Sequence, residues 1–208
     1  MLSSIKKSPR PRGRPRQFDA GAVLERATGV FWSRGLSTTT LDELSAATGL
    51  VRPSIANAFG DKHDLYRLAL ARFSEQVRGR VAEVLTSSDD LATALARFYS
   101  SALDVYCAQD PALGCFVMCT APVEAVTHPE VRELLSSLIA DLDEVLRERF
   151  AAARRDGQLA ASADAAALAR LAQSVLHSLA IRARSGASKP SLHRIARDAV
   201  KLLTRRKG

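Results

Sequence analysis

Apolar residues recur every three to four positions along almost the whole chain, and this period constrains the fold more than any other feature. The first clear stretch carries Val23, Leu24, Ala27 and Phe31, a spacing that places side chains on one face of an α-helix. No alternation of apolar and polar residues predicts a strand. Apolar residues make up 47% of the chain and aromatic residues only 5%, and the prevalence of alanine and leucine favours helices. The sequence therefore predicts an all-α protein.

Helix-capping residues divide this pattern into nine predicted helices. Thr40 and Glu43 have the spacing of a capping box, and Thr127 and Glu130 repeat it. Gly35 is expected to end the first helix as a left-handed cap. We expect an N-terminal three-helix helix-turn-helix domain, followed by a six-helix C-terminal regulatory and dimerisation domain. The expected helices span about 20–34, 40–47, 51–59, 61–86, 90–110, 114–126, 127–157, 163–185 and 190–204.

Positive charge is concentrated at the N-terminus. The formal net charge is +8, and six basic residues precede residue 19 with no acid among them. A basic arm on a nearly neutral body points to nucleic acid as the partner, and a solubilising tail is the alternative. Within the arm, arginines alternate with proline and glycine in the manner of an AT-hook, which suits a narrow minor groove. The expected minor-groove contacts come from Arg10, Arg12, Arg14 and Arg16.

The segment from Thr39 to Phe59 has the pattern of a helix-turn-helix, with a tight turn at Gly49 between two short helices. In such a motif the second helix enters the major groove and presents its first residues to base edges. A plain corner between two helices is the alternative. Arginine can bind guanine through two hydrogen bonds, and asparagine can bind adenine. The expected base contacts come from Val51, Arg52, Pro53, Ser54 and Asn57.

Three stretches within about residues 14–66 carry a family resemblance: Gly13-Arg-Pro-Arg-Gln-Phe-Asp19, Thr40-Leu-Asp-Glu-Leu-Ser-Ala-Ala-Thr-Gly49 and Arg52-Pro-Ser-Ile-Ala-Asn-Ala-Phe-Gly-Asp-Lys62. They resemble the TetR family of repressors. The resemblance implies a homodimer, double-stranded DNA with a palindromic operator as partner, an unknown small-molecule effector, and phosphate contacts from Thr40 and Lys62. Ala56 stands where the family usually has a phosphate-binding tyrosine, which implies a larger role for the arm.

The rest of the chain is similar to the family in helix number and length and in a Gly114–Cys115 pair. The resemblance implies that the last two helices form the dimer interface. Small residues on the first of these two helices allow close helix packing, although ordinary core packing within one chain is the alternative. The small residues that suggest such packing are Ala165, Ala169, Ala172 and Ala180.

The resemblance also implies an effector pocket, which we expect within residues 65–150. The scarcity of charged residues in the interior predicts a neutral or apolar effector. Cys115 and Cys119 share a predicted helix face, so redox or electrophile sensing, with or without Cys107, competes with the alternative that these are small apolar core residues. The candidate pocket residues, for which core packing is again the alternative, are Phe73, Phe98, Tyr106, Phe116, Met118 and Leu142.

Other function classes find little support in the sequence. It has no Gly-rich phosphate loop, no HExxH and no GxSxG, so we expect no enzyme activity, no catalytic or metal-binding residue and no cofactor. The sequence shows neither a membrane span nor a signal peptide, and we expect a cytoplasmic protein associated with the nucleoid. An architectural protein that binds AT-rich DNA is the alternative function. The expected domains are an arm (1–17), a DNA-binding domain (18–62) and an effector-binding and dimerisation domain (63–208).

Overall fold

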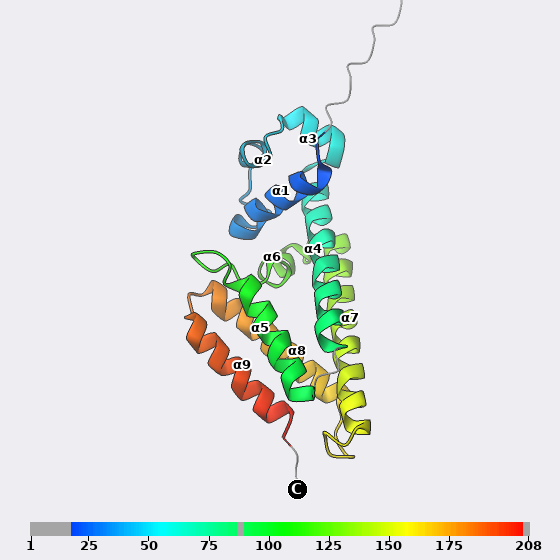
Figure 1. Ribbon diagram of the computed structural model, residues 1–208. Coiled ribbons are helices and arrows are strands. Elements are labelled where there is room, and N and C mark those ends of the chain that lie inside the picture. Colours follow the sequence, from blue (N-terminus) through cyan, green and yellow to red (C-terminus); the bar gives the residue numbers. More distant parts are fainter. Residues whose placement is uncertain (1–17, 87–89, 206–208) are drawn as a thin grey trace, which may run out of the picture.

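The computed structural model describes residues 18–86 and 90–205, which form nine α-helices and no strand. The predicted all-α fold is thus confirmed. In Figure 1, α1 to α3 lie at one end of the molecule, α4 runs from that end along the body, and α9 lies at the side of the body away from α7. The helices are α1 (Ala20–Arg34), α2 (Leu41–Thr48), α3 (Arg52–Phe59), α4 (Lys62–Leu85), α5 (Leu91–Tyr106), α6 (Phe116–Glu124), α7 (Pro129–Arg155), α8 (Ala165–Arg184) and α9 (Lys189–Leu203).

Local capping explains where the first helices begin and end. The Asp19 carboxylate accepts hydrogen bonds from two backbone N–H groups in the first turn of α1. Thr40 and Glu43 form the predicted capping box of α2, and Gly49 ends that helix in the left-handed conformation, with φ 74° and ψ 9°. Gly35 has a positive φ of 79° but an extended ψ of 173°, so the left-handed helical cap expected there is wrong. A residue with a Cβ would be strained at either glycine.

The long helix α4 joins the N-terminal helices to the body. Tyr66 of α4 is fully buried, and its ring packs edge-on against Phe31 of α1 at 5.2 Å and against Phe116 of α6 at 5.8 Å. Its hydroxyl lies 2.8 Å from the Thr120 hydroxyl of α6. One aromatic cluster therefore joins α1 to α4 and α6 of the body.

The body is a bundle in which α7 packs against α4 and α8, and α9 packs against α5 and α8. The turn before α6 approaches α8 so closely that a Cβ at Gly114, whose φ is 67°, would overlap the carbonyl oxygen of Ala180. This close approach gives a structural reason for glycine at the start of the Gly114–Cys115 pair.

The expected helix boundaries agree with the structure within two residues except at one helix end, and one expected cap does not form. The helix predicted to reach Asp110 ends at Tyr106. The second expected capping box is wrong: α7 is capped at His128, which forms no side-chain cap bond, whereas the Thr127 hydroxyl lies 3.0 Å from His128 Nδ1. Because the cap lies one residue later than expected, Glu130 is only two residues inside the helix instead of the three that a capping box requires.

The small residues of α8 pack inside the chain. Ala165, Ala169, Ala172 and Ala180 are all less than a tenth exposed, so the alternative of ordinary core packing is correct for them. The outer side of α8 instead exposes Leu171 (57%) and Ile181 (55%), and α9 exposes Leu202 (72%).

Candidate functional site

The helix α3 exposes its first turn and one side while burying the other. Ile55 and Phe59 face the core, with exposures of 1% and 8%. The helix begins after Val51, with Pro53 in its first turn, where proline costs no hydrogen bond. The structure therefore brings the five expected base-contacting side chains together on one accessible end of the molecule. Val51, Arg52, Pro53 and Asn57 are exposed, and Ser54 is half-buried.

Arg52 is held by a neighbouring helix. Its Nε donates a hydrogen bond of 2.8 Å to Asp42 Oδ1 in the first turn of α2, and its NH2 group forms an ion pair with the same oxygen. This hydrogen bond and the arginine's charge lower the pKa of the Asp42 carboxyl. Both side chains are largely exposed, so the pair can open when a better acceptor, such as a guanine edge, is present.

Thr40 and Lys62, the two expected phosphate contacts, have structural partners within the chain. The Thr40 hydroxyl and backbone N–H both bond to Glu43 Oε2. Lys62 Nζ donates to the carbonyl oxygens of Leu36 at 3.0 Å and Thr39 at 2.8 Å. An ammonium group has three donors, so Lys62 can hold the turn between α1 and α2 and still offer one N–H to a phosphate.

The expected minor-groove arginines Arg10, Arg12, Arg14 and Arg16 lie outside the described residues. The described chain starts at Phe18, whose ring packs against that of Phe59 at the end of α3, with 6.0 Å between ring centroids. The arm is thus attached beside the helix expected to read bases. This aromatic contact was not predicted, and the only signal for it in the sequence is an aromatic residue directly after the basic run.

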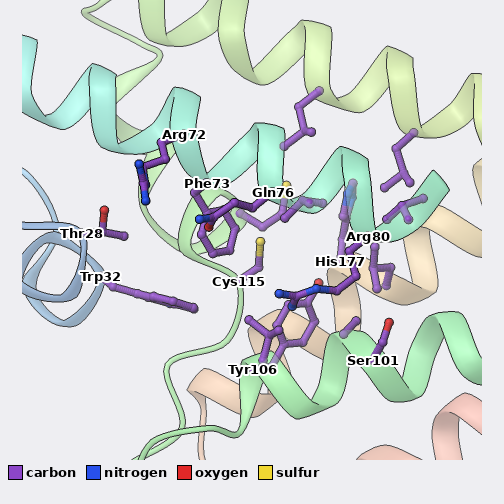
Figure 2. A pocket seen from close by; sticks show the side chains of 18 of the residues that line it. Thr28, Trp32, Arg72, Phe73, Gln76, Arg80, Ser101, Tyr106, Cys115 and His177 are labelled. Carbon is purple, nitrogen blue, oxygen red and sulfur yellow. The ribbon is translucent and has the colours of Figure 1, made fainter. Parts of the chain in front are cut away.

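A cavity of about 510 Å³ lies between α1, α4, α5, α6, α7 and α8. Figure 2 shows side chains from these helices converging on it. Five of the six expected pocket residues line it, namely Phe73, Phe98, Tyr106, Met118 and Leu142. The sixth, Phe116, is fully buried behind it against Phe73 and Trp32.

The cavity is more polar than the sequence suggested. Arg72, Gln76 and Arg80 of α4 line it together with Glu25 of α1, so charged residues are less scarce around the cavity than the sequence predicted. These residues were not predicted because they lie on the partly exposed side of α4, and a helical pattern does not show which neighbour covers that side. His177 also lines the cavity; burial lowers its pKa, so its imidazole is neutral at pH 7.

Two family models match the chain. The model described as "Tetracyclin repressor-like, C-terminal domain" matches residues 92–199, just over half of the chain, and the one described as "Bacterial regulatory proteins, tetR family" matches residues 23–69. The chain belongs to the TetR family. The resemblance identified from the sequence is thereby confirmed, and it extends beyond residues 14–66 into the body.

Individual TetR-family relatives match over most of their length. The HTH-type transcriptional repressor ComR of Escherichia coli (strain K12) is 27% identical over 199 residues, which cover 95% of this chain and 93% of that protein. The HTH-type transcriptional regulator YezE of Bacillus subtilis (strain 168) is 27% identical over 76% of this chain and 82% of that protein. A solved structure of a cysteine mutant of the TetR family transcriptional regulator CifR, complexed with 26 bp double-strand operator DNA, has 30% identity and a TM-score of 0.78, and covers 90% of this chain and 98% of that chain.

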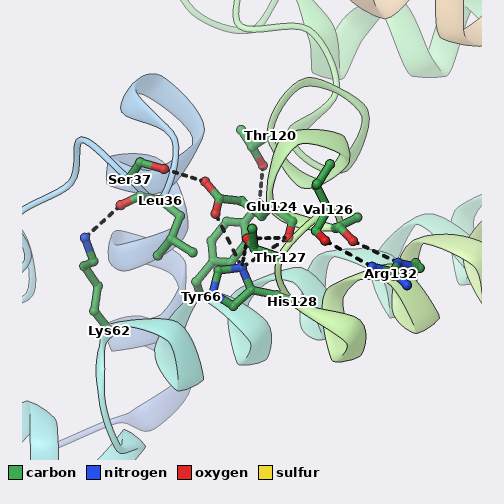
Figure 3. A network of polar contacts seen from close by, with 11 residues as sticks. Leu36, Ser37, Lys62, Tyr66, Thr120, Glu124, Val126, Thr127, His128 and Arg132 are labelled. Carbon is green, nitrogen blue, oxygen red and sulfur yellow. Dashed lines mark hydrogen bonds and ion pairs between the residues drawn. The ribbon is translucent and has the colours of Figure 1, made fainter.

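In this TetR-family chain, α6 connects the cavity to the end of the molecule formed by α1 to α3. Its first turn carries cavity residue Met118, and its last residue, Glu124, is 8% exposed. Glu124 Oε1 accepts a hydrogen bond of 2.8 Å from Ser37 in the turn between α1 and α2, and Oε2 lies 3.7 Å from His128 Nδ1. Figure 3 shows this network between the α1–α2 turn and the α6–α7 junction.

A second polar link joins α8 to the end of α1. Arg184 NH1 donates to the carbonyl oxygens of Trp32 at 2.8 Å and Leu113 at 3.2 Å, and NH2 donates to Ser33 at 3.3 Å. Because α1 ends at Arg34, its last carbonyl oxygens receive no hydrogen bond from a backbone N–H of the same helix. Arg184 therefore supplies the donors that hold this helix end against the body.

The three cysteines differ in burial, but the thiol pKa is raised in all three. Burial raises the pKa of Cys107, Cys115 and Cys119, that of Cys115 to about 11. Since the thiolate is the reactive form, all three thiols are poorly reactive at neutral pH. Within the described residues no cluster of His, Cys, Asp or Glu could hold a metal ion, and no helix there is long and apolar enough to cross a membrane.

Proposed function

We propose that this chain is a dimeric transcriptional repressor that binds a palindromic operator and releases it when a small effector occupies the cavity. In this proposal residues 1–17 are a minor-groove arm, 18–62 bind the major groove, and 63–208 bind the effector and the second subunit. The protein then works on the nucleoid in the bacterial cytoplasm and has no enzyme activity.

The observation that carries the proposal is the exposure of the first turn of α3. Arg52 and Asn57, which can bind base edges through paired hydrogen bonds, lie exposed beside Val51 and Pro53. The buried Ile55 and Phe59 hold this surface on a rigid core. The operator DNA in the CifR complex and the description of ComR as a repressor support the same proposal.

The dimer interface in this proposal is the exposed apolar surface of α8 and α9. Leu171 and Ile181 lie ten residues apart on the outer side of α8, and Leu202 lies near the end of α9. Exposed large apolar side chains on adjacent helices suit a four-helix contact between two copies. A two-fold axis there would present two α3 helices to half-sites about 34–36 Å apart.

Release follows from the position of the cavity between α1 and α4. An effector that contacts Trp32 of α1 and Phe73 of α4 changes how these helices pack. The Ser37–Glu124 bond and the Arg184 contacts tie the same elements to the body. Occupied and empty forms then present α3 at different spacings, and their difference in effector affinity sets the extent of release.

The test has two steps. Selection of DNA from a random library by the purified full-length protein should give a palindrome, whereas enrichment of AT-rich DNA without symmetry would support an architectural protein instead. The selected operator is then placed at the promoter of a reporter gene. Expression should fall when the protein is present, and a rise would contradict the repressor role.

A further inference from the structure

The unpaired polar groups that line the cavity are mainly hydrogen-bond donors. Among the described residues, the guanidinium groups of Arg72 and Arg80 have no hydrogen bond or ion pair, and the buried indole N–H of Trp32 has no acceptor. The hydroxyls of Thr28 and Ser101 already donate to carbonyls of their own helices, at 2.7 Å and 3.0 Å. Unsatisfied donors at a cavity require an acceptor from a ligand or from water.

The donors lie along one side of α4. Arg72, Gln76 and Arg80 are spaced four residues apart, which places them on one helix face. The backbone positions of the two arginines are about 12 Å apart along the helix axis. Their side chains are long enough to bring the two guanidinium groups closer together than this. Figure 2 shows the three side chains directed from α4 towards the space shared with α1 and α5.

The ionisable side chains that line the cavity near Arg72 and Arg80, here called its rim, carry a net positive charge. Two guanidinium groups stand against one carboxylate, that of Glu25, which is exposed on α1. Gln109, also exposed, is uncharged. His177 adds no positive charge at pH 7 because burial lowers its pKa.

The opposite side of the cavity carries buried apolar side chains. Phe98, Leu138, Leu142 and Leu176 line it and are each less than a tenth exposed. A cavity of about 510 Å³ is within the range for sites that enclose small molecules. A ligand that fills it must therefore present an apolar body to α5, α7 and α8 and an acceptor to α4.

We propose that the cavity binds an amphipathic anion, a carboxylate on an apolar chain or ring, with the carboxylate against Arg72 and Arg80 and the apolar part among the leucines. Arginine suits a carboxylate because its planar donors bind both oxygens. This inference rests on the proposed effector site and replaces the neutral or apolar effector expected from the sequence.

The chain carries its own reporter for the test. Trp32 is the only tryptophan and it lines the cavity, so its fluorescence responds to occupancy. The full-length protein is titrated with decanoate, 1-decanol and decylammonium, which share one apolar chain and differ in charge. Decanoate should bind at least about tenfold more tightly than decanol, and decylammonium should bind most weakly.

Variants test whether the preference for decanoate over decanol comes from the two arginines. The double variant Arg72→Gln/Arg80→Gln should lose most of the tenfold preference and keep decanol binding. Arg67→Gln is the matched control, because Arg67 is also on α4 but pairs with Asp64 outside the cavity. Arg80→Gln alone, at an exposed position, should lose part of the preference and serves if the double variant does not fold.

Three results would overturn the inference: equal affinity for decanoate and decanol, equal loss in the arginine and Arg67 variants, or no saturable decanoate binding up to about 1 mM. Operator binding is measured separately by fluorescence anisotropy of labelled DNA. Arginine-dependent decanoate binding that leaves the operator complex intact would support the anion site and contradict the proposed release. Failure to bind any selected DNA would contradict the proposed function, whatever the titration shows.

Discussion

Replacing Arg184 with methionine should detach the end of α1 from the body. The guanidinium donates to the carbonyl oxygens of Trp32 and Ser33 in the last turn of α1 and to Leu113 before α6. No other hydrogen bond to these carbonyls of α1 is present among the described residues. Methionine keeps the apolar stem of the side chain but removes every donor and the positive charge at the C-terminal end of the helix dipole.

The expected cost follows from the number and quality of these bonds. A hydrogen bond from a charged donor contributes about 1.5–3 kcal/mol when fully formed. Here NH1 is shared by two acceptors and the bond from NH2 is long, at 3.3 Å. Arg184 is also only half-buried, so water replaces part of what is lost. We expect the free energy of unfolding to fall by about 2–3 kcal/mol.

The assay is equilibrium unfolding in urea, followed by Trp32 fluorescence and by circular dichroism at one fixed protein concentration, since dimerisation contributes to stability. Arg182→Met is the matched control, because Arg182 is exposed on the same helix and bonds only to Ser178 within it; it should cost less than about 0.5 kcal/mol. Equal losses in the two variants would refute the claim that Arg184 holds α1.

Three further predictions concern DNA and assembly. Deleting residues 1–16 should lower operator affinity and reduce the salt slope of binding by up to about 0.9 per lost phosphate contact, and an unchanged slope would show that the arm does not touch DNA. Arg52→Ala should cost roughly 1–3 kcal/mol of binding and relax the preference at one base of each half-site, whereas Lys62→Ala should weaken all sequences about equally; selection on randomised DNA checks both, and the opposite pattern would exchange their roles. Wild-type protein should have the mass of a dimer by light scattering, and Leu202→Glu should yield folded monomers because it places a charge on the exposed apolar surface. Leu176→Glu should instead unfold the protein, since that side chain is buried at the cavity; a stable wild-type monomer that bound a full palindrome tightly would contradict the dimer.

Sequence-based prediction succeeded where the determining contacts are local. The capping box at Thr40 and Glu43 involves only neighbours in the chain, and it forms as expected. The repeat of that spacing at Thr127 fails because the chain turns one residue later, where Thr127 bonds instead to His128 and to the α6 backbone. The same residue pattern thus gave one correct and one wrong helix start, and only the path of the preceding helix distinguishes them.

For the candidate sites too, features set by local sequence could be predicted and features set by tertiary packing could not. The exposed residues of α3 could be identified from the sequence because a helix-turn-helix fixes which turn is presented. The positive rim of the cavity could not, since Arg72 and Arg80 satisfy the helical pattern equally well as solvated surface residues. Likewise the alanines of α8 suit any close helix contact, and only the packed chain shows that their neighbours belong to the same subunit.

The contact between Phe18 and Phe59 has a consequence for the length of the operator. An extended chain advances about 3.3 Å per residue, so Arg16 can reach about 7 Å and Arg10 about 26 Å from Phe18. Half a helical turn of DNA is about 17 Å, so in the proposed complex we expect the arginines to reach the minor groove that flanks the bases under α3. We therefore predict that the footprint exceeds the palindrome on both sides, and that base changes in these flanks alter affinity through groove width even where no symmetric consensus is visible.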